Sequence, residues 1–114
     1  MKGKTCFYDV EALDGDIRIC LKGEMDHHNA VGVRGEIDKL IYDERPKRLM
    51  LDLSEIGFMD SSGLGFIMGR YALMEKLGGT LILENPNERI VKIFELAGLQ
   101  RIVRIENSKK EKTK

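Results

Sequence analysis

Two serines and an aspartate stand together where an apolar segment gives way to a helical pattern. Asp60, Ser61 and Ser62 follow an apolar run that ends at Met59. The first backbone N–H groups of a helix have no partner within the helix, and the helix dipole favours negative charge there. A serine in this position can cap the helix, accept a phosphoryl group, or do both. The complete segment reads Met59-Asp60-Ser61-Ser62-Gly63-Leu64-Gly65.

Catalysis by one of these serines would need a nearby base, and two histidines are available. His27 and His28 are the histidines of the chain, so a Ser61–histidine pair is one interpretation. The motif is not a nucleophile elbow, because G-x-S-x-G is absent, and it lacks the Gly-Lys-Ser/Thr of a Walker A loop. No oxyanion hole or substrate pocket is indicated. We therefore favour a protein that is modified and reports its state by binding, rather than an enzyme.

A metal site is the other chemistry that these residues suggest. Asp26, His27 and His28 provide three possible ligands in a row. Adjacent side chains usually diverge, and no second ligand cluster accompanies them, so we expect neither a metal nor another cofactor. On the simpler interpretation, Asp26 caps the helix that follows and the histidines lie in a surface loop. By the same reasoning, Asp60 and its two serines would do no more than start a helix.

The segments around these residues alternate between strand-like and helix-like patterns. Alternating or continuous apolar residues predict five strands, the first two joined by a turn at Asp14-Gly15. The predicted strands are residues 5–10, 16–22, 48–53, 80–83 and 102–105. The first helical pattern spans residues 30–41, and the second runs from Ser61 to a stop at Gly78-Gly79. The third is expected to start with Asn85 as the cap and Pro86 in the first turn, and to end at Gly98.

This β-β-α-β-α-β-α-β order predicts an α/β domain with a mixed, mostly parallel sheet packed against helices. Loops that follow parallel strands emerge at one edge of the sheet, where sites gather. Residues 24–29 follow one strand and residues 57–63 follow another, so we expect the two loops to lie close together.

The helix that begins at Ser61 is apolar on two sides. One stripe is formed by Leu64, Ile67, Met68, Tyr71 and Met74, and a second strip by Phe66, Leu73 and Leu77. A helix of this kind is either buried on both sides or covered by another molecule. The first possibility places both strips in the core. The second leaves Phe66 partly exposed beside Ser61, where it would contact a partner.

Length and composition set the remaining limits. The 114 residues suit one domain with one core, and 42% of them are hydrophobic. Neither a bilayer-spanning run nor a signal peptide is recognisable, which predicts a cytoplasmic protein without membrane contact. Cys6 and Cys20 are expected to be reduced thiols, a disulfide between them being the alternative.

Charge is balanced over the whole chain but not along it. Residues 107–114 carry four lysines and Glu111 without any apolar side chain, which predicts a disordered tail behind a domain of residues 1–106. Nucleic-acid binding would need a basic face and stacking aromatic residues within the folded part. Neither is visible in the sequence, so we expect no nucleic-acid partner.

Three segments in matching order give the chain a family resemblance. They are Gly23-Glu24-Met25-Asp26-His27-His28-Asn29-Ala30, Phe58-Met59-Asp60-Ser61-Ser62-Gly63-Leu64-Gly65 and Leu96-Ala97-Gly98-Leu99. Across residues 4–106 the chain resembles the anti-sigma factor antagonists that consist of a STAS domain. The Asp-His-His segment is most similar to the sporulation branch, whose members antagonise the anti-sigma F factor.

The resemblance implies regulation by exchange of binding partners. In that family the unphosphorylated antagonist binds an anti-sigma factor, which is also a serine kinase, and so releases a sigma factor. The kinase phosphorylates the antagonist and frees itself, and a serine phosphatase reverses the modification. The implied phosphorylation site is Ser61, the serine directly after the aspartate. The expected partner-binding surface comprises Asp26, His27, Asp60, Ser61, Ser62, Gly63 and Phe66.

Two other classes of function remain as alternatives. The first is a STAS module that serves as an interaction scaffold without switching. The second is a small catalytic or receiver-type domain, which would need an acidic cluster around a divalent ion. Asp52 and Asp60 flank the end of the third strand, but no acidic pair follows the first strand.

Overall fold

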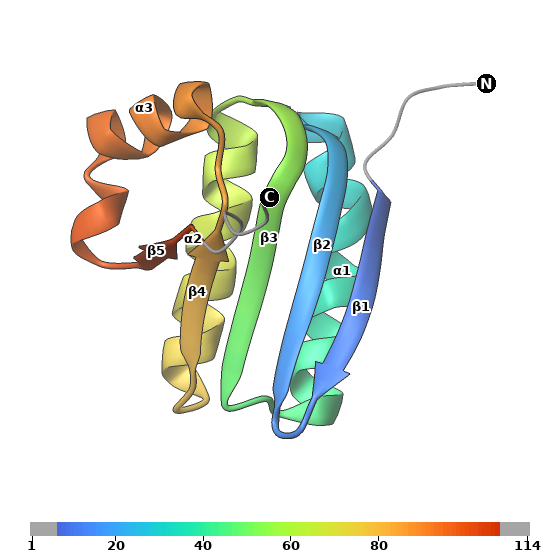
Figure 1. Ribbon diagram of the computed structural model, residues 1–114. Helices are drawn as coiled ribbons and strands as arrows, with labels where there is room; N and C mark the ends of the chain where they lie inside the picture. Colours follow the sequence, from blue (N-terminus) through green and yellow to red (C-terminus); the bar gives the residue numbers. More distant parts are fainter. Residues whose placement is uncertain (1–6, 108–114) are drawn as a thin grey trace, which may run out of the picture.

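The computed structural model describes residues 7–107, which form a five-stranded sheet with helices against it (Figure 1). The strands are β1 (Phe7–Leu13), β2 (Asp16–Met25), β3 (Arg48–Met59), β4 (Thr80–Glu84) and β5 (Arg104–Glu106). The helices are α1 (His27–Glu44), α2 (Ser61–Lys76) and α3 (Glu88–Ala97), followed by the short 3-10 helix η1 (Leu99–Arg101). Cys6 and residues 108–114 of the expected tail lie outside the described residues.

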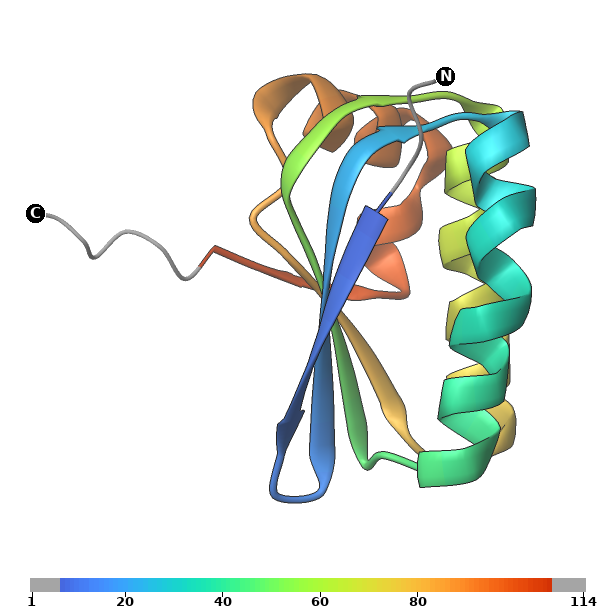
Figure 2. The same cartoon turned by 90° about the vertical axis from the view of Figure 1, so that its right-hand side faces the viewer.

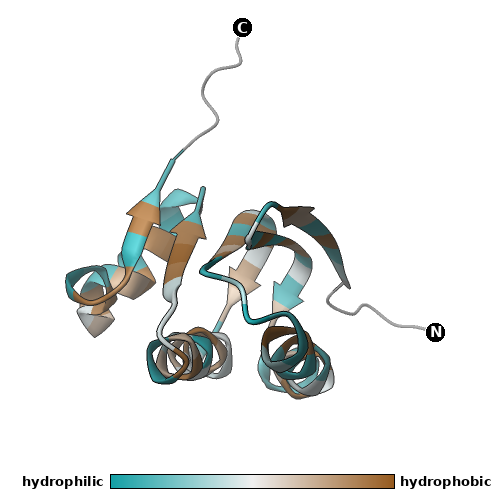
Figure 3. Cartoon of the chain, turned by 90° about the horizontal axis from the view of Figure 1, so that it is seen from below, coloured by the Kyte–Doolittle hydropathy of each residue, from teal (hydrophilic) through white to brown (hydrophobic). Residues whose placement is uncertain are grey.

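The strands follow one another across the sheet in their order along the chain. β1 pairs antiparallel with β2 through the Asp14-Gly15 turn, and the pairs β2–β3, β3–β4 and β4–β5 are parallel. Both turn residues have positive φ, as a tight hairpin requires. Helices α1 and α2 lie side by side on one face of the sheet (Figures 2 and 3). The predicted mixed, mostly parallel α/β architecture is confirmed.

The core lies between the sheet and the helices, and α3 and η1 add Ile90, Phe94 and Leu99 to it. In β2, Ile17, Ile19 and Leu21 are buried, while the residues between them are partly exposed, as the alternation predicts. β3 contributes Leu49, Leu51 and Leu53, and α1 contributes Val33, Ile37 and Ile41. Each fully buried aliphatic side chain of this kind stabilises the fold by about 1.5–3 kcal/mol. The core therefore fixes which side of each helix faces the sheet.

The predicted start of α3 is wrong by two residues. Asn87, not Asn85, is the N-cap, and its Oδ1 accepts a hydrogen bond of 2.9 Å from the backbone N–H of Ile90. Asn85 has a left-handed backbone, with φ of 57°, and its N–H donates to the Glu106 carbonyl at the end of β5. This backbone hydrogen bond holds Asn85 at the end of the sheet, before the helix begins. Asn87 also donates its side-chain N–H to the Ile56 carbonyl, which ties α3 to β3.

The strands beside the serine motif are longer than predicted. β2 continues to Met25 and β3 to Met59, although the expected strands end at residues 22 and 53. The pairing of β2 with β3 passes through register shifts between Cys20 and Lys22 and between Gly23 and Glu24. Such irregularities bend a strand and interrupt its alternation, so the extension left no clean pattern in the sequence. The last strand, β5, occupies residues 104–106 rather than 102–105.

A glycine substitution on the outer side of α1 tests the assignment of that helix. Gly35 is exposed, and a Cβ atom there would meet no atom within 4 Å. Gly35→Ala should raise the free energy of unfolding by up to about 1 kcal/mol, because alanine is the better helix former. In a domain of this size that corresponds to a melting temperature about 4–8 °C higher, measured by thermal denaturation. A lower melting temperature would contradict an exposed helical Gly35.

Candidate functional site

The starts of α1 and α2 meet at one edge of the sheet. Met25 and Met59 are the last paired residues of the parallel strands β2 and β3, and each is followed by an aspartate that begins a helix. The backbone N–H of Asp60 lies 3.4 Å from the Met25 carbonyl oxygen, which links the two chain segments directly. The expectation that the loops after these strands lie close together is confirmed.

Both aspartates are helix caps. Asp26 Oδ1 accepts a hydrogen bond of 3.0 Å from the Asn29 N–H. Asp60 Oδ1 accepts from the N–H groups of Ser62 and Gly63, at 2.8 and 3.2 Å. A carboxylate satisfies the unpaired donors and complements the helix dipole at the same time. The predicted cap role of Asp26 is confirmed, and at α2 the capping group is the carboxylate of Asp60 rather than a serine hydroxyl.

The two serine hydroxyls have different surroundings. Ser61 is exposed in the first position of α2, and its hydroxyl has no hydrogen-bond partner among residues 7–107. Ser62 is half-buried, and its Oγ lies 3.4 Å from Nδ1 of His27. The histidine therefore meets Ser62, not Ser61. His27 and His28 are exposed residues in the first turn of α1 rather than in the loop that precedes it.

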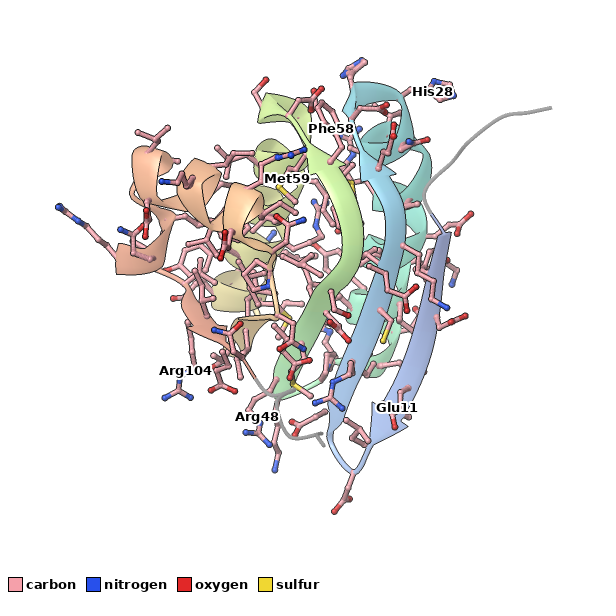
Figure 4. All side chains as sticks on the ribbon, turned by 45° about the horizontal axis from the view of Figure 1, so that its top comes forward. Glu11, His28, Arg48, Phe58, Met59 and Arg104 are labelled. Carbon is pink, nitrogen blue, oxygen red and sulfur yellow. The ribbon has the colours of Figure 1, made fainter. Side chains whose placement is uncertain are left out.

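An outward face of α2 continues from Ser61 along the helix. Gly65 and Met68, four and seven residues further on, are also exposed. Met68 keeps 38% of its surface exposed, so its predicted place in the buried stripe is wrong. Phe58, which precedes the motif on β3, is 43% exposed, and Figure 4 shows it at the same end of the molecule as His28. Phe58 was not among the predicted partner-binding residues, because the predicted strand ended at residue 53.

Gly63 and Phe66 are buried. A Cβ atom on Gly63 would lie 2.5 Å from the Met25 carbonyl oxygen, so only glycine lets α2 start this close to β2. Phe66 is 4% exposed, so of the two possibilities left open by the sequence the one in which it is partly exposed is wrong. The Arg70 guanidinium carbon lies 4.8 Å from the centre of its ring. The second apolar strip of α2 belongs to the core, since Leu73 and Leu77 also pack against it.

A groove of about 320 Å³ is lined by residues of α1 and α2 and opens beside the serine motif. His27 and Ser62 line it near the two helix starts, and Arg34 and Arg70 line it further along. Arg70 is 5% exposed and pairs with Asp38, its Nε lying 2.9 Å from Asp38 Oδ1. Burial lowers the pKa of Arg70, and the neighbouring Arg34 acts in the same direction while Asp38 opposes them. Neither arginine was singled out from the sequence.

The structure also separates the two aspartates of the receiver-type alternative. Asp60 caps α2, whereas Asp52 lies on β3 between Leu51 and Leu53, which face the core. Alternation places Asp52 on the other face of the sheet, where its carboxylate accepts from Ser54 and Asn85.

Within residues 7–107, no group of three or more His, Cys, Asp or Glu side chains is arranged to hold a metal ion. No helix in that range is both long and apolar enough to cross a membrane.

Comparison with known proteins gives consistent matches over most of the chain. The model of the STAS domain family matches residues 8–112. The anti-sigma-B factor antagonist of Bacillus subtilis (strain 168) is 35% identical over 97 residues, which cover 85% of this chain and 87% of that protein. The anti-sigma F factor antagonist of Paenibacillus polymyxa is also 35% identical over 97 residues, covering 85% of this chain and 83% of that protein.

Solved structures match the fold as well. The unphosphorylated form of the anti-sigma factor antagonist SpoIIAA superposes with a TM-score of 0.79 and 29% identity, covering 92% of this chain and 90% of that one. The phosphorylated form of the Bacillus cell fate determinant SpoIIAA gives a TM-score of 0.73, again with 29% identity, over 92% of this chain and 94% of that one.

Substitution of the cap distinguishes the roles of Asp60 and Ser61. Asp60→Ala should lower the free energy of unfolding by about 1 kcal/mol, because two N–H groups lose their acceptor. Asp60→Asn keeps an oxygen acceptor and should stay close to the wild type. Ser61→Ala should change stability by less than about 0.5 kcal/mol, because its hydroxyl caps nothing. Urea denaturation measures all three variants, and an equal loss in Asp60→Ala and Ser61→Ala would refute the cap assignment.

Proposed function

This chain belongs to the STAS domain family, and from that premise we propose that it is an anti-sigma factor antagonist switched off by phosphorylation of Ser61. The observation that carries the proposal is that the cap of α2 and its exposed serine hydroxyl belong to different residues. Asp60 supplies the cap, while the hydroxyl of Ser61 is exposed and has no partner among the described residues. Modification of Ser61 therefore removes no hydrogen bond that the described fold uses. The names of the relatives, antagonists of anti-sigma factors, support the same role.

The fold can accept a phosphoryl group at this position. Phosphorylation adds about 1.5–2 negative charges near neutral pH. Ser61 is the first residue of α2, and the start of α1 lies beside it. The positive ends of two helix dipoles therefore act on the new charge and favour it. We infer that the phosphorylated protein keeps the fold of the unmodified one.

For a partner that covers this surface, the phosphoryl group would be unfavourable. The new dianion would stand next to the carboxylates of Asp60 and Asp26, and the interface would have to desolvate it. Phe58, three residues before Ser61, and Met68, seven residues after it, are exposed apolar side chains of the kind that form the centre of an interface. Leaving a charge buried and unpaired in an interface costs about 2–5 kcal/mol or more, and each 1.4 kcal/mol is tenfold in affinity. The switch would thus act on recognition and leave folding unchanged.

The proposed cycle needs two protein partners and no cofactor. An anti-sigma factor with serine kinase activity binds the unmodified protein, releases its sigma factor and phosphorylates Ser61. A serine phosphatase returns the protein to the binding state. We place the protein in the cytoplasm, where a sigma factor acts, and we assign it no catalytic activity of its own. The two relatives compared above, one antagonist of an anti-sigma-B factor and one of an anti-sigma F factor, are each 35% identical to this chain, so we base the proposed sporulation role on the Asp26-His27-His28 segment.

Intact mass after incubation with ATP and purified anti-sigma F factor tests the phosphorylation site. The wild type and Ser62→Ala should each gain one phosphoryl group, and Ser61→Ala should gain none. The anti-sigma-B factor serves as a second kinase in a parallel reaction and tests the sporulation assignment. Modification of Ser61→Ala, for example on Ser62, would refute Ser61 as the acceptor. Absence of modification in every reaction would favour a STAS scaffold that does not switch.

A phosphomimetic substitution tests whether the switch acts on binding. Ser61→Asp should weaken binding to the anti-sigma factor at least tenfold, because it adds a carboxylate beside Asp60 in the interface. Its melting temperature should stay within about 2 °C of the wild type, since the helix start favours negative charge. Calorimetric titration and thermal denaturation measure the two quantities. A large loss of stability with unchanged affinity would show that Ser61 has only a structural role.

A further inference from the structure

The groove of about 320 Å³ between α1 and α2 has room for an inserted side chain. Ser62, Phe66 and Arg70 succeed one another at intervals of four residues and form its α2 wall. At 1.5 Å per residue the groove extends about 12 Å from Ser62 to Arg70. Ala30, Gly65 and Gly69 also line it, and their small size keeps the two helices from filling the space with side chains. The groove thus leads from Ser62, the neighbour of the proposed phosphorylation site, to Arg34 and Arg70.

Arg70 is buried in this groove with part of its guanidinium unused. Its Nη2 lies 3.4 Å from Asp38 Oδ2, and its Nε is close to Asp38 Oδ1 without the alignment of a hydrogen bond. Nη1 is buried and has no hydrogen-bond partner among the described residues. A buried donor that is left unpaired costs about 1–3 kcal/mol, and more when it is charged. An acceptor that enters the groove would relieve this cost.

The charged side chains that line the groove itself are positive. Arg34 is exposed, and no residue of the described range forms an ion pair with it. None of the nine residues that line the groove is acidic, because Asp38 approaches Arg70 from outside the lining. His27 and the starts of both helices stand at the open end. A positively lined groove with apolar walls selects an anion on a short apolar stem.

We propose that this groove receives an aspartate or glutamate side chain of the anti-sigma partner, whose carboxylate pairs with Arg70 and Arg34. A guanidinium holds a carboxylate through charge-assisted hydrogen bonds of defined direction, and such buried anchors dominate the energy of many interfaces. The inference rests on the proposed function, since it specifies the chemistry of that partner. It also gives phosphorylation a second effect, because the dianion on Ser61 repels an acidic side chain at the entrance of the groove.

Charge reversal in the groove tests the inference by calorimetric titration with purified anti-sigma F and anti-sigma-B factors. Arg34→Glu should weaken binding at least tenfold, and Arg34→Lys by less. The matched control is Arg101→Glu on η1, an exposed arginine away from the groove, which should stay within twofold of the wild type. Arg70→Lys keeps the charge but loses the planar fork, and should also weaken binding. Its melting temperature is measured alongside, and Arg34→Glu carries the test if Arg70→Lys does not fold.

A crosslink identifies the occupant directly. With p-benzoylphenylalanine in place of Val31, which lines the groove and is half exposed, irradiation of the complex should attach a partner peptide that contains Asp or Glu. Changing that acid to lysine should restore binding to Arg34→Glu. Unchanged affinity of Arg34→Glu, or a crosslinked segment without an acidic residue, would overturn the inference while the proposed function stands. Failure of the wild type to bind either anti-sigma factor would overturn the proposed function and this inference with it.

Discussion

The parallel pairing of β2 with β3, continued to Met25 and Met59, is the constraint on which the site depends. Because both strands end at the same level, the chain turns into α1 and α2 at neighbouring positions. The contact is so close that α2 can begin only with a glycine at position 63, against the Met25 carbonyl. Two helix starts are thereby held side by side. The electrostatic surroundings of the serine motif follow from this arrangement. A single helix would place one helix dipole at Ser61, whereas here the start of α1 lies beside the start of α2.

Because cap and exposed hydroxyl belong to different residues, the stability of α2 does not depend on the residue that we propose to be modified. Asp60 satisfies the N–H groups at the start of α2, so the helix does not need the oxygen of Ser61. A residue that held the helix together could not be modified without cost to the fold. An exposed hydroxyl next to a cap, in contrast, lies where backbone geometry is fixed and where added negative charge is favourable. Rigidity and accessibility are both useful to an enzyme that must recognise the site.

The negative charge of a phosphoryl group on Ser61 would have opposite effects on the fold of the domain and on the binding of a partner. Within the domain, a phosphoryl group would lie at the positive ends of α1 and α2. For a partner that covers Phe58, Met68 and the entrance of the groove, it would be a dianion next to two carboxylates. Arg34 and Arg70 would attract an acidic side chain of the partner into the groove, and the phosphoryl group on Ser61 would repel the same side chain. The proposed phosphorylation of Ser61 and the proposed carboxylate binding by Arg34 and Arg70 thus depend on the charges along the groove and at its entrance, where α1 and α2 start.

Several features of this protein were determined by the sequence itself because they depend on contacts within a few residues. Asp26 and Asp60 cap helices through bonds to residues two or three positions away, and the alternation in β2 follows from the geometry of an extended chain. Such local rules, together with a family resemblance, were enough to predict the order of elements, the meeting of the two loops and the place of the motif at a helix start. The cap of α3 was misplaced because Asn85 bonds to Glu106, a partner distant in sequence.

Only the tertiary structure decided which apolar and charged side chains surround the motif. Phe66 is buried and Met68 is exposed because α1 packs beside α2 on one side and leaves the other open, and the pattern of α2 alone fits either outcome. Likewise, His27 meets Ser62 and Arg34 approaches Arg70 only because two helices from separate parts of the chain lie together. Helical periodicity gives the angle between side chains on one helix, whereas the position of a neighbouring helix is set by the packing of the whole core.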